Sequence, residues 1–161
     1  MAWSESQRTR LGVEKGILDK YFPNDRVRWS NPSNVNSWVE ITMASNSNKV
    51  YKIRVYLAAD FPNSCPEMVM VSPQNLKQRN GRALPTMSDA FHTLEQRDGY
   101  TKICHYRPGL WTAEITLYQV FMKARLWIEA YEGHIATGNN MDVYLKHQGS
   151  SGTGGDNCAI L

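Results

Sequence analysis

Three features are scarce in this chain of 161 residues: cysteine, long apolar runs and an excess of one charge. The three cysteines are far apart, at Cys65, Cys104 and Cys158, and no Cys-x-x-Cys or His-x-x-x-His pair occurs, which excludes a disulfide scaffold and a regular zinc site. No uncharged apolar run approaches the ~20 residues of a transmembrane helix. The formal charge of +3 at pH 7 is too small to predict nucleic acid as a partner.

The composition is that of a globular domain. Hydrophobic residues make up 42% of the chain and charged residues 20%, and the length suits one domain with a core of its own. The N-terminal segment lacks the apolar stretch of a secretory signal, and an odd number of widely spaced cysteines is typical of free thiols in a reducing compartment. We therefore expect a cytoplasmic protein without a metal or a cofactor.

The sequence pattern predicts a helix followed by strands in the first half of the domain. Ser4 and Gln7 match a capping box at the start of the helix, and Pro23 ends it. Apolar and polar residues then alternate, which predicts an antiparallel meander with one buried face. The four expected strands are 26–30, 37–44, 49–57 and 67–71.

The second half contains a long stretch without periodicity and then a strong helix. Residues 72–110 exceed the ~12–15 residues of an ordinary connection, and such stretches tend to be functional. Thr112 is the expected N-cap of the helix, Gly133 or Gly138 its end, and 141–147 an optional short terminal helix. The apolar stripe of the long helix is Leu117, Val120, Phe121, Ala124, Trp127, Ile128 and Tyr131.

These elements predict a two-layer α+β domain over residues 1–148, in which two helices cover the buried face of a small sheet. Its order is an N-terminal helix, a four-stranded antiparallel meander, a long active-site loop and a long C-terminal helix. Residues 149–161 form a tail that begins with the composition of a flexible linker.

Three short segments resemble the ubiquitin-conjugating enzyme family, over roughly residues 4–135. The segment 61–69, Phe-Pro-Asn-Ser-Cys-Pro-Glu-Met-Val, is similar to the family's Tyr-Pro-Phe-x-Pro-Pro-x-Val. The segment 103–105, Ile-Cys-His, is similar to the Gly-x-Ile-Cys-Leu that carries the thioester-forming cysteine, and 111–113, Trp-Thr-Ala, to the Trp-Ser-Pro before the next helix. The resemblance implies the ubiquitin-conjugating fold.

The resemblance also implies a function and partners. Cys104 would receive ubiquitin or a ubiquitin-like modifier as a thioester and pass it to an amine. His92, the second catalytic candidate, would orient the active-site loop through hydrogen bonds from its ring or serve as a base; its structural interpretation is that of a loop histidine. The first helix, including Arg8 and Lys15, would dock the activating enzyme, and Phe61 would contact a ligase.

The sequence departs from the family where the oxyanion is stabilised. The family's His-Pro-Asn corresponds here to His92-Thr93-Leu94, so the asparagine is missing, and Asn75, Asn80 or a backbone N–H are the candidate replacements. This departure favours an alternative function, a non-catalytic ubiquitin-binding or scaffolding variant of the same fold.

Each candidate residue also has a structural interpretation. Cys104 and Cys65 are as readily explained as buried packing residues, Phe61 as core, and Arg8 and Lys15 as an ordinary solvated helix face. A dyad of Cys104 with the adjacent His105 is a further alternative with less support, because sequence neighbours often point apart.

The last four residues, Cys158-Ala159-Ile160-Leu161, form a C-a-a-X box whose leucine favours geranylgeranylation of Cys158 in a eukaryotic cytosol. A single prenyl chain anchors only marginally, and no polybasic stretch supplies a second signal. We therefore expect reversible, peripheral membrane association. A lipid-anchored adaptor unrelated to ubiquitin remains a third interpretation.

Overall fold

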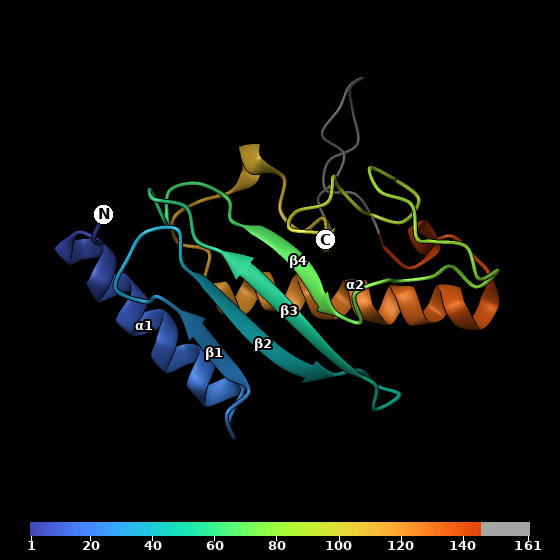
Figure 1. The fold of residues 1–161 in the computed structure, drawn as a ribbon, viewed down its shortest axis with the longest axis horizontal. Coiled ribbons are helices and arrows are strands. Elements are labelled where there is room, and N and C mark those ends of the chain that lie inside the picture. The colour runs from blue at the N-terminus through green and yellow to red at the C-terminus, as the bar shows by residue number, and fades with distance from the viewer. Residues whose placement is uncertain (146–161) are drawn as a thin grey trace.

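The computed structural model describes residues 1–145. Helix α1 (Glu5–Tyr21) is followed by a five-stranded antiparallel sheet in the order β1-β2-β3-β4-β5, and helix α2 (Leu117–Thr137) comes last among the long elements. The long helix α2 crosses behind the sheet and α1 lies alongside β1 (Figure 1). The strands are β1 (Val27–Ser30), β2 (Trp38–Ala44), β3 (Val50–Tyr56), β4 (Glu67–Ser72) and β5 (Thr101–Lys102).

The α+β class and the meander are confirmed, and the number of strands is corrected from four to five. The fifth strand, β5, has only two residues and pairs with β4 through Val69 and Met70. A strand this short carries no alternation that a sequence pattern can show. It lies within the expected long loop, whose remaining residues are held by isolated bridges such as Thr93 with Ile103.

The ends of the helices follow local hydrogen-bond chemistry. The capping box of Ser4 and Gln7 is confirmed at the start of α1. The N-cap of α2 is Thr116 and not the expected Thr112, because Thr116 and Gln119 form the reciprocal pair of bonds that defines a capping box. Gly138 ends α2 in the left-handed conformation, with φ 80°.

The expected short terminal helix after α2 is present as a single 3₁₀ turn, η2 (Met141–Val143). A second 3₁₀ turn, η1 (Pro108–Leu110), precedes α2. The turn η2 is tied to the long loop, because the Met141 amide donates to the carbonyl of Ala90 at 3.1 Å. The C-terminal part of the described chain therefore supports the loop that the sequence singled out.

The core lies between the inner face of the sheet and α2. The apolar stripe of α2 is fully or almost fully buried, as its periodicity predicted. The sheet contributes alternate residues, including Val39, Ile41, Ile53 and Val55, which are all inaccessible to solvent. At about 25 cal/mol per Å² of buried apolar area, this layer contact is the main favourable term that holds the domain together.

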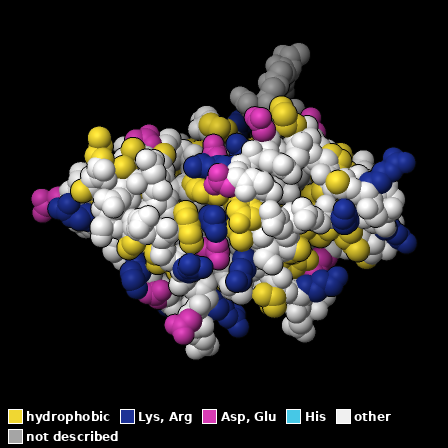
Figure 2. All heavy atoms as spheres, in the orientation of Figure 1, with side chains coloured by type: hydrophobic (Ala, Val, Ile, Leu, Met, Phe, Trp, Pro, Cys, Tyr) yellow, Lys and Arg dark blue, Asp and Glu magenta, His cyan; other side chains and the backbone are white. Residues whose placement is uncertain are grey.

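The outer face of the sheet is a layer of charged and aromatic side chains. Figure 2 shows Lys and Arg side chains interspersed with acidic and apolar ones over the centre of this face. The Arg54 guanidinium stacks 4.1 Å above the Trp38 ring and pairs with Glu40 at 3.0 Å. The charge of Arg54 is thus paired within the sheet itself, and this face carries charges of both signs.

Candidate functional site

The three segments that resemble the conjugating family lie in contact. The Trp111 indole donates its Nε1–H to the carbonyl of Pro62 at 2.8 Å, which joins the last segment to the first. The Cys104 amide donates to the carbonyl of His92 at 3.0 Å, which joins the cysteine segment to the long loop. Segments up to 49 positions apart in sequence thus meet around the start of β4.

His92 is held firmly from two sides. Its ring is fully buried, and Nε2 lies 2.6 Å from the Oδ1 of Asp142 on η2. The Trp127 indole of α2 donates to the carbonyl of His92 at 3.2 Å. His92 has a left-handed backbone with φ 51°, a conformation that costs about 1 kcal/mol for a non-glycine residue and needs such support. The carbonyl of His92 therefore accepts from both the Trp127 indole and the Cys104 amide.

Cys104 follows β5 directly after the buried Ile103. Its side chain is fully buried in this structure. The ring of His105 turns toward Cys65 and Pro66, so the structure does not form the Cys104–His105 dyad. A catalytic role and a structural role for Cys104 must therefore both be consistent with its full burial.

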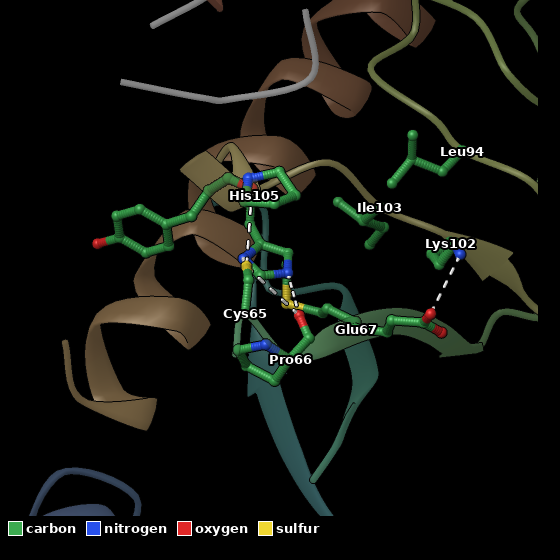
Figure 3. Close-up of a pocket in the computed structure, with 10 residues that line it drawn as sticks. Cys65, Pro66, Glu67, Leu94, Lys102, Ile103 and His105 are labelled. Carbon is green, nitrogen blue, oxygen red and sulfur yellow. Dashed lines mark hydrogen bonds and ion pairs between the residues drawn. The ribbon is translucent and has the colours of Figure 1, made fainter. Parts of the chain in front are cut away.

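A pocket of about 240 Å³ opens beside this segment, and its chemistry comes from Cys65 and His105 (Figure 3). The Cys65 sulfur lies 4.0 Å from His105 Nδ1, and His105 Nε2 lies 2.6 Å from the carbonyl of Pro66. Figure 3 shows the ion pair of Glu67 and Lys102 on the far side of the pocket from His105. The remaining lining residues are mainly apolar: Met68, Leu94, Ile103, Tyr106 and Pro108.

Burial sets the protonation of this pair. It raises the pKa of the Cys65 thiol to about 12 and, as the largest influence, lowers the pKa of His105 to about 4. Both groups are therefore neutral at pH 7. Since a carbonyl only accepts, the proton of His105 is on Nε2 and the lone pair of Nδ1 faces the thiol.

A second pocket of about 290 Å³ shares Cys65, Pro66 and Glu67 with the first. Its lining is more polar and includes the Ser37 hydroxyl and Arg97. Ser37 is 2% exposed, and its Oγ has no hydrogen-bond partner in the part of the chain that the structure describes. Cys65 consequently stands where an apolar pocket and a polar pocket adjoin.

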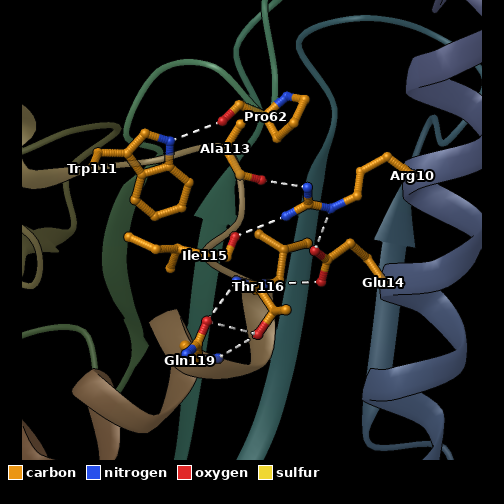
Figure 4. A network of polar contacts seen from close by, with 9 residues as sticks. Arg10, Glu14, Pro62, Trp111, Ala113, Ile115, Thr116 and Gln119 are labelled. Carbon is orange, nitrogen blue, oxygen red and sulfur yellow. Dashed lines mark hydrogen bonds and ion pairs between the residues drawn. The ribbon is translucent and has the colours of Figure 1, made fainter.

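Next to this region, a partly buried ion pair and its hydrogen bonds join α1 to the segment before α2 (Figure 4). Arg10 and Glu14 of α1 pair at 2.8 Å, and the Arg10 guanidinium also donates to the carbonyls of Ala113 and Ile115. The other oxygen of Glu14 accepts the amide of Leu117, the first residue of α2. This network fixes the segment between Trp111 and α2.

The residues expected to bind partners differ in exposure. Arg8 and Lys15 are exposed on α1; Arg8 donates to the carbonyl of Trp3 at 2.7 Å, and Lys15 pairs with Asp19 at 2.8 Å. Phe61 is 1% exposed, with the Arg10 guanidinium 5.8 Å from its ring centre. Its placement is that of a core residue, the structural interpretation of this position.

Several contacts were not expected from the sequence. The partner of His92, Asp142, is fifty positions away, and the partner of His105, Cys65, is forty positions away. Neither pair follows a motif, and a dyad of His105 with the adjacent Cys104 had little support from the sequence. The C-a-a-X cysteine, Cys158, lies outside the described residues.

Comparison of the chain with protein-family models, with curated proteins and with solved structures returns no match in any of the three. Within residues 1–145, no helix is both long and apolar enough to cross a membrane. The same residues contain no group of three His, Cys, Asp or Glu side chains placed to hold a metal ion.

Proposed function

We propose that this chain is a ubiquitin-conjugating-like protein that carries ubiquitin or a ubiquitin-like modifier as a thioester on Cys104. The observation that supports the proposal is the contact between its three family-like segments, through Pro62 with Trp111 and Met68 with Ile103. Motif matches that arise by chance in a sequence have no reason to meet in space. Here they converge on the cysteine that the resemblance assigns to catalysis.

The proposed chemistry is two successive acyl transfers. The Cys104 sulfur attacks the carbonyl of the thioester between the modifier and the activating enzyme, and the thiol of that enzyme leaves. An amine then attacks the new thioester, and the Cys104 sulfur leaves as the isopeptide bond forms. His92, held by Asp142, positions the backbone of Cys104 during both steps.

This reaction requires a reduced and reachable Cys104. The side chain is fully buried here, so charging requires a local opening of the segment after β5.

A second candidate function uses the same fold without catalysis. The burial of Cys104 and the presence of Leu94 in place of the family's asparagine favour a non-catalytic module that binds ubiquitin or acts as a scaffold.

A charging assay separates the two functions. Pre-reduced protein is incubated with ATP, an activating enzyme and ubiquitin, and is resolved with and without thiol reductant. The proposal predicts a reductant-sensitive adduct that Cys104→Ala abolishes, that Cys104→Ser converts into a reductant-resistant ester, and that Cys158→Ser retains. A chain that forms no adduct but shifts the NMR signals of labelled ubiquitin without ATP is the non-catalytic module.

A further inference from the structure

The candidate for a second reactive centre is Cys65, which no part of the proposed thioester chemistry on Cys104 uses. Its Sγ lies 4.0 Å from Nδ1 of His105, and it also lies 3.7 Å from the carbonyl oxygen of Tyr106 and 3.8 Å from that of Pro66. It also lines both the apolar pocket and the polar pocket described above. Cys65 and His105, forty positions apart in sequence, thus place a nucleophile and a base at the wall of one pocket.

The third group of the arrangement is the carbonyl of Pro66. It accepts from His105 Nε2 at 2.6 Å, which fixes the ring orientation and leaves Nδ1 as the base toward the thiol. A nucleophile beside a base that a third group orients is the general pattern of covalent catalysis. The carbonyl also stabilises the imidazolium that forms when the ring takes a proton.

The electrostatic environment keeps this pair neutral. Burial is the largest influence on both groups, raising the pKa of Cys65 to about 12 and lowering the pKa of His105 to about 4. The charged groups that face His105 are Lys123 of α2, which lowers its pKa, and Glu67 of β4, which raises it; Tyr106 lies beside Cys65. The imidazole is therefore neutral at physiological pH, but it is a weak base beside a thiol that is a weak acid, so the proton can move only in concert with formation of the new carbon–sulfur bond.

The two pockets indicate the kind of molecule that would react. The one lined by Met68, Leu94 and Ile103 suits an apolar chain, and the adjoining one offers Arg97 and the buried Ser37 hydroxyl to a polar group. Ser37 Oγ has a donor without a protein acceptor among the described residues, so a ligand oxygen would satisfy it. The thiol lies at the junction of an apolar and a polar compartment.

We propose that Cys65 and His105 form an acyl-accepting centre for a thioester that joins an apolar acyl chain to a polar carrier. The Cys65 proton moves to His105 Nδ1 as the sulfur attacks the acyl carbonyl. The carbon–sulfur bond of the incoming thioester breaks, and the departing thiolate takes the proton from Nδ1. The products are an S-acylated Cys65 and the free carrier thiol, so neither an oxidant nor a further reactant is needed.

The experiment uses the full chain, pre-reduced, and the hexanoyl thioester of N-acetylcysteamine as the probe. Peptide mass mapping follows acylation of each cysteine with time from pH 5 to pH 8. General-base attack by a neutral pair predicts a rate at Cys65 that changes less than twofold across this range. A solvent-like thiol reacts as the thiolate and gains about tenfold in rate per pH unit below its pKa of about 8.5.

Variants test the role of the histidine. His105→Gln keeps a donor for the Pro66 carbonyl but removes the base, and we expect acylation at pH 7 to fall about 100-fold. His134→Gln is the matched control, because His134 is as buried as His105 but lies outside both pockets, and its rate should match the wild type. Ser37→Ala should slow acylation without altering the pH profile.

Three results would overturn the proposal: no acyl group on Cys65, equal losses in the two histidine variants, or a rate at Cys65 that follows thiolate formation. The pH profile of the unmodified chain decides the matter even if His105→Gln does not fold. None of these results depends on whether Cys104 is charged with ubiquitin.

Discussion

The carboxylate of Glu14 accepts the amide hydrogen of Leu117 at 2.9 Å, so a buried charge on α1 caps the first turn of α2. Glu14 is fully buried, and its second oxygen pairs with Arg10 at 2.8 Å. A negative charge at a helix N-terminus is favourable, because the unpaired amides there carry partial positive charge. This contact couples the first and last helices of the domain through one side chain.

Removing Arg10 should therefore destabilise the domain strongly. Arg10→Met leaves Glu14 as a buried charge with one partner fewer, and we expect a loss of about 3 kcal/mol in the free energy of unfolding, measured by urea titration. Lys15→Met is the control, because it breaks an exposed pair of the same i,i+4 spacing on the same helix. That pair should contribute about 0.5 kcal/mol or less. Similar losses in both variants would contradict the role given to Glu14.

Much of the fold was predictable because its signals are local. The capping box at Ser4 and the alternation in β2 and β3 each depend on a few neighbouring residues, and all appear as expected. The N-cap at Thr116 was also readable, since Thr116 and Gln119 have the capping-box spacing. The two-residue strand β5 was not, because its existence depends on pairing with β4 alone.

The candidate site was less predictable for a different reason. From the sequence, Glu14 is expected on the polar face of an amphipathic helix. Only the structure shows that it is buried against the start of α2. His105 follows Cys104 in sequence, yet its ring contacts Cys65. Contacts between side chains forty or more positions apart have no periodic signature, so a single sequence cannot identify them.

Stability should depend on pH through His105. Its pKa is lowered by burial to about 4 in the folded chain, against about 6.5 in the unfolded chain. The unfolded state therefore binds more protons between these values, and stability falls as the pH drops from about 6.5 to 4. A pKa shift of this size corresponds to about 3 kcal/mol in the free energy of unfolding, which the chain has in full above pH 6.5 and loses as the pH falls to about 4.

The measurement is urea unfolding at several pH values. His105→Gln should flatten the curve between pH 4 and pH 6.5, whereas His134→Gln should retain the contribution of His105. An equal slope in the wild type and in His105→Gln would show that His105 is not the neutral buried group described.

The missing oxyanion donor can be restored by substitution. If Leu94 corresponds to the family's asparagine, as the resemblance implies, Leu94→Asn should accelerate discharge of charged Cys104 to free lysine while leaving charging itself unchanged. A single oxyanion donor is typically worth about 10²–10³ in rate, and we expect at least a tenfold gain. Discharge is followed on gels after the activating enzyme has been stopped. An unchanged rate in a folded variant would show that Leu94 is not the equivalent position.

The C-a-a-X box predicts membrane association for a chain that ends at Leu161. In eukaryotic cells part of the wild-type protein should sediment with membranes, and Cys158→Ser should move it to the supernatant. A single prenyl chain binds membranes weakly and reversibly, so repeated washing should also release the wild type. Identical fractionation of the two proteins would rule out lipidation as the cause of any membrane binding.

The central proposal is that Cys104 carries the modifier, and the intact mass of the charged protein tests it most directly. Pre-reduced full-length chain, ATP, an activating enzyme and ubiquitin are combined, and the product is weighed and its linkage mapped by proteolysis. We predict one ubiquitin, less one water, attached to Cys104 and released by thiol reductant. A chain that stays unmodified while a known conjugating enzyme is charged in the same mixture, or an adduct on any other residue, would contradict the account.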